Sequence, residues 1–150
     1  MRLILVRHAK ARNRKKWNKD DLKRPLTKKG MKQAKKLAKY ISKKYSNADA
    51  ILTSLALRSL DTAKYIVKQQ AHCAFFLTPS LNPDKSIEEF LKHQVSIKKD
   101  WRRLIVVGHE PAISEFLRSL ALDLHIGKGC VVELERQNKG RWVLIGLNNF

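Results

Sequence analysis

The stretch Arg2-Leu3-Ile4-Leu5-Val6-Arg7-His8-Ala9-Lys10 decides the fold, because an apolar run in it ends abruptly in charged residues. A run this short, bounded by charges, is typical of a buried strand in a parallel sheet. In open α/β sheets, ligands bind at the carboxyl ends of the strands. The stretch therefore predicts that His8 stands at a ligand crevice, with the fixed positive charge of Arg7 beside it.

Further short apolar runs alternate with helical patterns along the rest of the chain. Strands are predicted at 49–54, 73–78, 104–109, 131–135 and 142–147, and helices at 28–44, 55–70, 87–97 and from 110–111 through 120. Such alternation favours an α/β three-layer sandwich, with a mostly parallel sheet of about six strands and helices on both faces. The last two strands are expected to form a hairpin around the turn 138–140. We expect residues 1–150 to form a single domain.

The length and composition fit one soluble core. The chain has 150 residues, of which 43% are hydrophobic, enough for one domain with one core. Cys73 and Cys130 have no CxxC spacing, so the sequence predicts neither a zinc site nor a disulfide framework. This use of cysteine fits a reducing compartment. The first apolar run stops at Arg7, short of a signal peptide, and no stretch reaches the length of a membrane span. We therefore expect a cytoplasmic protein that does not bind membranes.

The chain is strongly basic. It carries 32 Lys and Arg residues against 13 Asp and Glu, a formal net charge of +19, and many of the lysines lie in the predicted helix 28–44. A field of this sign attracts nucleic acid, an anionic membrane surface, phosphorylated compounds or an acidic protein. A compositional bias that only solvates the surface explains the same charge, so the charge alone does not choose a partner.

Four cationic or titratable side chains are expected to meet at one edge of the sheet. His8 and His109 end two predicted strands, Arg7 precedes His8, and Arg58 lies in the helix after a third strand. Arginine forks bind phosphate oxygens in pairs, so we infer a phosphoryl ligand. A histidine there could be a metal ligand, a general acid or base, or a nucleophile. Neighbouring arginines repel a metal ion, whereas they favour the neutral, nucleophilic form of His8, so we expect no metal and no cofactor.

Four segments in the same order resemble the signature motifs of the histidine phosphatase superfamily. Residues 6–9 are similar to its Arg-His-Gly motif, and residues 24–30 to its "RPLTxxG" motif. Residues 54–63 are similar to "SPxxRAxQTA", and residues 107–111 to its second-histidine motif. Together they span nearly the whole chain. The short length and the "RHAK…RPLT" form most resemble the SixA-type phosphohistidine phosphatases. The resemblance implies the phosphoglycerate mutase-like fold.

Carried over residue by residue, the resemblance makes His8 the nucleophile that accepts the phosphoryl group. Arg7, Arg58 and His109 would line the phosphate pocket, where His109 also counts among the catalytic residues. Ala9 stands where the family has glycine, and Leu55 stands where it has proline. The glutamate proton donor of the mutase-like branch has no counterpart in this sequence. Asp84 is the one acid that we nominate as proton donor. The alternative is that Asp84 is only a turn residue beside Pro83.

These observations predict a phosphohistidine phosphatase that acts in signal transduction through a covalent phospho-His8 intermediate. Its partner would be a phosphorylated protein, such as a histidine phosphotransfer domain or a phosphocarrier, and phosphate or vanadate would bind in the pocket. We expect a monomer. A phosphatase of small phosphate esters with the same pocket is the first alternative. A basic nucleic-acid-binding protein is the second, although the tryptophans lack the interleaved basic pattern of a stacking platform.

Overall fold

The fold is described from a computed structural model, which covers residues 1–94 and 100–150. Its strands are β1 (Arg2–Arg7), β2 (Ala50–Thr53), β3 (Ala74–Leu77), β4 (Arg103–Gly108), β5 (Val131–Arg136) and β6 (Trp142–Asn148). Its α-helices are α1 (Lys28–Lys44), α2 (Leu57–Val67), α3 (Ile87–Gln94) and α4 (Ala112–Ser119). Short 3-10 turns are η1 (Arg14–Lys16), η2 (Asp21–Lys23), η3 (Pro79–Leu81) and η5 (Asn138–Gly140).

The six strands form one sheet in the order β3-β2-β4-β1-β5-β6. The first four are mutually parallel, whereas β5 runs antiparallel to β1 and joins β6 in an antiparallel hairpin. The predicted mostly parallel sheet and the predicted hairpin are both confirmed. Apolar β1 and β4 lie in the middle because strands buried on both faces need apolar side chains in both directions.

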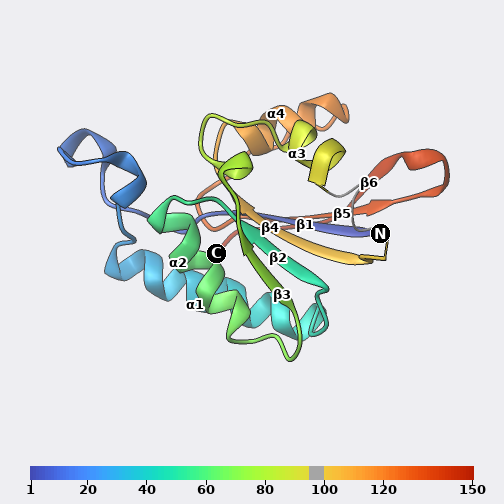
Figure 1. The fold of residues 1–150 in the computed structure, drawn as a ribbon, viewed down its shortest axis with the longest axis horizontal. Helices are drawn as coiled ribbons and strands as arrows, with labels where there is room; N and C mark the ends of the chain where they lie inside the picture. Colours follow the sequence, from blue (N-terminus) through green and yellow to red (C-terminus); the bar gives the residue numbers. More distant parts are fainter. Residues whose placement is uncertain (95–99) are drawn as a thin grey trace.

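Helices cover both faces of the sheet, so the predicted three-layer sandwich is confirmed (Figure 1). Helices α1 and α2 lie on one face, and α3 and α4 lie on the other. Alternate side chains of β1 supply both cores: Leu3 and Leu5 pack on the α3–α4 side, and Ile4 and Val6 on the α1–α2 side. This alternation follows from the two-residue period of a strand.

The parallel pairing of β1 with β4 brings the two strand ends to the same edge. Arg7 pairs with Gly108 in register, so His8 and His109 are the next residues on neighbouring strands. The backbone N–H of His8 donates a 3.1 Å hydrogen bond to the carbonyl of Gly108. The sequence prediction that both histidines meet at the carboxyl edge of the sheet is therefore confirmed.

The start of α1 is fixed against the segment that follows β1. Thr27 caps the helix, because its hydroxyl accepts a 3.0 Å hydrogen bond from the backbone N–H of Gly30. A Cβ on Gly30 would lie 1.9 Å from the carbonyl oxygen of Lys10, so only glycine permits this approach. The contact holds the chain just after His8 against the helix.

Some element boundaries differ from the predictions. Residues 11–23, for which no strand or helix is predicted, contain η1 and η2, whose first turns are capped by the side chains of Asn13 and Asp20. Helix α4 begins at Ala112 rather than at 110–111, and Pro111 is its cap residue. Helix α3 is described to Gln94, and the rest of the predicted helix 87–97 lies outside the described residues. Within the described chain, no helix has both the length and the apolar character that crossing a membrane requires.

Candidate active site

His8 leaves β1 as a buried, neutral imidazole. Only 6% of its surface is exposed, and its Nδ1 lies 2.8 Å from the carbonyl oxygen of Ala9. A carbonyl can only accept, so Nδ1 carries the proton and Nε2 keeps a lone pair. Burial, followed by the nearby His109, Arg58 and Arg7, holds the pKa of His8 well below its usual range. The ring is therefore a free nucleophile at neutral pH.

His109 lies beside His8, with ring centroids 5.1 Å apart. Its Nε2 is 2.7 Å from the hydroxyl of Ser54, at the end of β2, and that hydroxyl accepts a hydrogen bond from the backbone N–H of Ala56. Because no other acceptor for the Ser54 hydroxyl lies among the described residues, its proton is donated to Nε2, which places the proton of His109 on Nδ1. Burial and then the charge of Arg58 lower the pKa of His109 to about 3. His109 is thus a neutral N–H donor.

Arg7 and Arg58 are each anchored at one end of the guanidinium. Nη1 of Arg7 donates a 2.7 Å hydrogen bond to the carbonyl of Ile126. Arg58, 3% exposed, donates from Nη1 to the carbonyl of Asp21 and from Nη2 to its carboxylate. Burial lowers the pKa of Arg58, and Asp21 opposes this effect. One hydrogen bond on Arg7 and two on Arg58 limit how far the arginine forks can move.

Several buried donors around the histidines have no acceptor. Nε of Arg7, Nε of Arg58 and Nδ1 of His109 are buried side-chain N–H groups without a hydrogen-bond partner among the described residues. One further buried donor of this kind, on Gln70, does not line the cleft. An unpartnered buried donor costs free energy, so three of them at one place indicate a site that a bound oxyanion completes.

These side chains line a cleft of about 820 Å³. Its walls carry eight Lys and Arg residues and two acids: Arg7, Lys10, Arg12, Arg14, Lys15, Arg24, Arg58 and Lys128 against Asp21 and Glu110. Both acids are engaged, because Asp21 pairs with Arg58 and Arg24, and Glu110 accepts from the hydroxyl and backbone N–H of Ser114. The cleft is therefore strongly cationic.

The structure brings together four of the five predicted site residues. His8, His109, Arg7 and Arg58 all line the cleft, whereas Asp84 does not. The side chain of Asp84 is 72% exposed and pairs with Lys85 at 3.2 Å, and only its neighbour Pro83 reaches the cleft wall. Our nomination of Asp84 as a proton donor is not supported by this geometry, because the carboxylate is held toward a solvent-exposed lysine.

Sequence reasoning did not identify two polar residues that position the site. Asp21 holds Arg58 although 37 positions separate them, and Ser54 holds His109 across 55 positions. Ser54 could have been found from its place at the end of a strand next to the strand of His109. Asp21 had no comparable signal, because its part of the sequence has no clear hydrophobic periodicity and its path depends on tertiary contacts.

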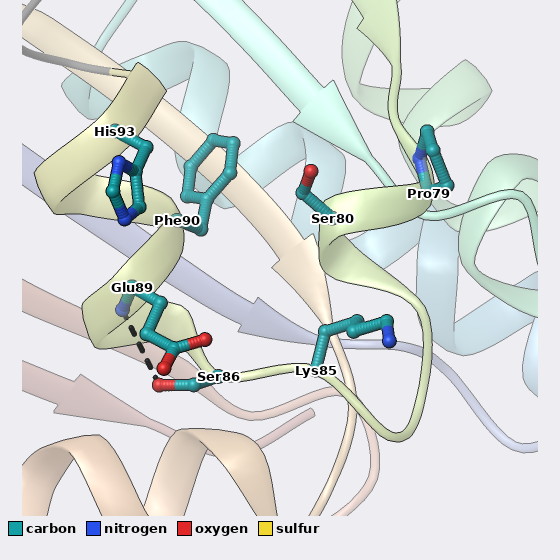
Figure 2. Close-up of a pocket in the computed structure, with 7 residues that line it drawn as sticks. All are labelled: Pro79, Ser80, Lys85, Ser86, Glu89, Phe90 and His93. Atoms are coloured by element: carbon teal, nitrogen blue, oxygen red, sulfur yellow. Dashed lines mark hydrogen bonds between the residues drawn. The ribbon is translucent and has the colours of Figure 1, made fainter.

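The cleft shows no metal-binding arrangement. Within residues 1–94 and 100–150, no group of three or more His, Cys, Asp or Glu side chains is placed to hold a metal ion. A second, smaller cavity of about 270 Å³ lies between η3 and α3, bordered by Pro79 and Ser80 on one side and by Glu89, Phe90 and His93 on the other (Figure 2). The described residues that line it include no arginine and neither of the two strand-end histidines, so this lining lacks the features of a phosphoryl site.

Comparison with solved structures finds the same fold over the whole chain. A protein proposed to be the phosphohistidine phosphatase SixA of Agrobacterium tumefaciens superposes with a TM-score of 0.84 at 22% identity, covering 99% of this chain and 97% of the other. The protein histidine phosphatase SixA in complex with tungstate superposes with a TM-score of 0.85 at 16% identity, covering 98% of this chain and 96% of the other. An alpha-ribazole phosphatase from Shigella flexneri superposes with a TM-score of 0.74 at 17% identity, covering 99% of this chain and 96% of the other. These likenesses confirm the predicted phosphoglycerate mutase-like α/β fold.

Sequence comparison gives the family. A search of the curated proteins finds no match. The family model "Histidine phosphatase superfamily (branch 1)" matches residues 3–82, which is more than half of the chain and includes His8, Arg58 and the segment between them. The resemblance to this superfamily is thereby confirmed, and the chain belongs to the histidine phosphatase superfamily.

Proposed function

We propose that this protein is a phosphatase that transfers a phosphoryl group from a substrate to His8 and then to water. The observation that carries the proposal is the state of His8: a buried, neutral imidazole with a free Nε2 among buried N–H donors that lack acceptors. A nucleophile needs its lone pair, and the developing charge on the phosphoryl oxygens needs preorganised donors.

In the first step, Nε2 of His8 attacks phosphorus. The new N–P bond forms while the bond from phosphorus to the leaving group breaks. Arg7, Arg58 and the Nδ1–H of His109 stabilise the three phosphoryl oxygens. The carbonyl of Ala9 accepts the hydrogen bond from Nδ1 of His8 as that ring gains positive charge. In the second step, water attacks phosphorus, the N–P bond breaks, and both protons of the water leave with the phosphate.

We propose phosphohistidine as the substrate group, because the described residues that line the cleft include no free acid. Asp21 and Glu110 are engaged by other groups, and the pKa of His109 is about 3, so none of them is a ready proton donor. An alkoxide must be protonated as it leaves. A phosphohistidine protonated on its other ring nitrogen leaves as neutral imidazole, whose conjugate acid has a pKa of about 6.5, and needs no donor from the enzyme.

The substrate we favour is a phosphorylated protein, a histidine phosphotransfer domain or a phosphocarrier, and the protein would act in cytoplasmic signal transduction. Support comes from the fold shared with proteins named as phosphohistidine phosphatases, one of them holding tungstate, an oxyanion that resembles phosphate. A phosphatase of small esters remains the second candidate, because an alpha-ribazole phosphatase shares the fold over nearly the same length.

A turnover assay on purified protein separates the two candidates. We expect kcat/KM on a phosphohistidine protein to exceed that on every ester of a panel that includes phosphoserine and aryl phosphates. Acid-labile radioactive phosphate should be trapped on the wild-type protein and not on the His8→Asn variant. Vanadate should inhibit and a chelator should not. If a small ester is turned over faster than any phosphohistidine protein, the protein is a phosphatase of small esters. A requirement for a stoichiometric metal ion would contradict the mechanism.

A further inference from the structure

The outer part of the cleft carries more positive charge than one phosphoryl group uses. Arg7, Arg58 and His109 surround His8 at the bottom, and Arg24 is bound to Asp21 and to the carbonyl of Arg12. Five cations remain, which we name the cationic rim: Lys10, Arg12, Arg14, Lys15 and Lys128. All five are exposed, and none has a side-chain hydrogen bond or ion pair within the described part of the chain.

The rim comes from two segments that are far apart in the sequence. Lys10 and Arg12 lie between β1 and η1, Arg14 and Lys15 lie in η1, and Lys128 comes from the turn before β5. The two segments are tied together, because Gln33 accepts from the backbone N–H of Lys10 and donates to the carbonyl of Lys128. The rim therefore frames the mouth of the cleft as one unit rather than as unrelated surface charges.

Like charges in the rim also act on the buried site. Arg14 is near enough to Arg58 that its charge helps to lower the pKa of Arg58, after the larger effect of burial. Holding cations together without counter-charges is unfavourable, and an anion bound at the mouth removes that cost. The same attraction draws an anionic partner toward the cleft before the phosphoryl group reaches His8.

We propose that the cationic rim binds acidic side chains of a polypeptide that flank the phosphorylated residue, so the rim selects phosphorylated proteins with an acidic surface. This inference rests on the proposed function in one respect, since it assumes that the phosphorylated side chain enters the cleft. Exposed, flexible Lys and Arg side chains suit carboxylates presented at several angles on a protein surface.

The lining of the cleft argues against nucleic acid as the occupant. No Trp, Tyr or Phe is among the described residues that line it. Proteins that bind single strands without sequence preference combine a cationic groove with aromatic side chains on which bases stack. Trp17, which lies nearby in the sequence, donates its indole N–H to the carbonyl of Asp20 and does not line the cleft. The charge is present without the stacking surface.

Two variants with the same change in charge test the proposal. In the rim variant, Arg12, Lys15 and Lys128 are all replaced by alanine. In the control variant, Lys35, Lys36 and Lys39 on the exposed face of α1 are replaced by alanine; these residues do not line the cleft. Both variants lose three positive charges, so a difference between them reports position rather than net charge. Arg12→Lys, Lys15→Arg and Lys128→Arg together form a charge-preserving third variant.

The substrates are two phosphohistidine peptides, one with aspartate and glutamate around the phosphorylated residue and one with asparagine and glutamine instead. We expect the rim variant to lower the ratio of kcat/KM for the acidic over the neutral peptide about tenfold, as the loss of three exposed ion pairs implies. The control variant and the charge-preserving variant should keep the wild-type ratio. The wild-type preference should weaken with salt, because exposed charges are screened. Equal ratios in the rim and control variants would overturn the proposal.

A binding measurement separates failure of the rim from failure of the proposed function. The unphosphorylated acidic peptide, carrying a neutral dye, should bind the wild type and the control variant more tightly than the rim variant in an anisotropy titration. If the wild type hydrolyses neither phosphopeptide but this difference is found, the proposed function fails and the rim stands. If both phosphopeptides are hydrolysed equally well and no binding difference is found, the rim proposal fails alone. An RNA oligonucleotide that binds the rim more tightly than the acidic peptide would also overturn it.

Discussion

Glu133 on β5 and the active-site cleft are both buried and polar, yet they differ in how completely their hydrogen bonds are made. The carboxylate of Glu133 is fully buried and accepts from the hydroxyls of Tyr40 and Tyr45 and from the ammonium of Lys44. Gly146, opposite it on β6, leaves the space: a Cβ there would lie 2.9 Å from the carboxyl carbon. The cleft instead leaves three buried N–H donors without acceptors.

The difference separates a structural cluster from a binding site. A buried charge with all its partners holds elements together, here β5 and the end of α1, and gives a ligand nothing to bind. A buried group of donors without acceptors is costly in the empty protein and becomes favourable when an anion arrives. Polar burial alone does not mark function, whereas unmet hydrogen bonds next to a neutral nucleophile do.

The largest expected effect is the loss of turnover in the His8→Ala variant, because the covalent step loses its acceptor. Turnover of the phosphohistidine substrate should fall to the background of the assay, while the free energy of unfolding should stay close to the wild-type value. His72→Ala, at an exposed histidine away from the cleft, is the control and should keep full activity. Substantial turnover by His8→Ala would rule out the covalent mechanism.

Arg58→Ala should lower kcat/KM by about 10²–10³-fold, the usual cost of removing one preorganised donor to a transition state. Arg58→Lys should recover only part of this loss, because an ammonium keeps the charge but not the planar fork. Steady-state kinetics on both variants measure the difference. Full recovery by lysine would mean that Arg58 acts only as a charge and that its anchoring by Asp21 is unimportant.

Glu133→Ala should act on stability rather than on catalysis. Removing one partner from a buried, hydrogen-bonded charge cluster should lower the free energy of unfolding by about 3 kcal/mol, measured by urea denaturation. Turnover per folded molecule should not change. Glu135→Ala, on the same strand, removes an exposed ion pair with Arg2 and should cost less than about 1 kcal/mol. If Glu133→Ala abolished kcat without lowering the free energy of unfolding, the assignment of a structural role to the Glu133 cluster and a binding role to the cleft would be wrong.

The two cleft histidines should remain neutral where an ordinary histidine protonates. Burial lowers the pKa of His8 well below 6.5 and that of His109 to about 3, so the folded protein does not take up these protons as the pH falls through 6.5. The unfolded chain does take them up, so the cleft contributes a loss of stability as the pH falls below 6.5, down to the folded-state pKa values. Nitrogen-15 NMR of the histidine rings measures this directly. A ring of either residue that titrates near 6.5 would contradict the neutral site.

The smallest expected effect is that of Asp84→Asn. Because this carboxylate is exposed and pairs with Lys85 outside the cleft, kcat on a phosphohistidine substrate should stay within about twofold of the wild type, as for most surface substitutions. A slow ester substrate provides the sharper test, since it depends most on a proton donor. A hundredfold loss on either substrate would restore Asp84 as the acid.

The sequence by itself determined the alternation of strands and helices, and with it the edge of the sheet where His8 and His109 meet. Parallel strands end at the same edge, so two apolar runs that each end in histidine fix this part of the site once the runs are identified as neighbours. The four motifs then assigned Arg7 and Arg58 to the same place. Local patterns suffice here because strand period and strand direction are local properties.

Only the tertiary structure decided which polar groups pair with one another. Contacts between distant segments set the hydrogen bonds between Arg58 and Asp21 and between Ser54 and His109. They also bury Glu133, which the strand pattern of its sequence does not distinguish from its neighbours. The same holds for Asp84, which lies close to the cleft in sequence but outside it in space. Side-chain pairing depends on angles and distances of a few ångströms, which packing of the whole chain sets and a one-dimensional pattern does not contain.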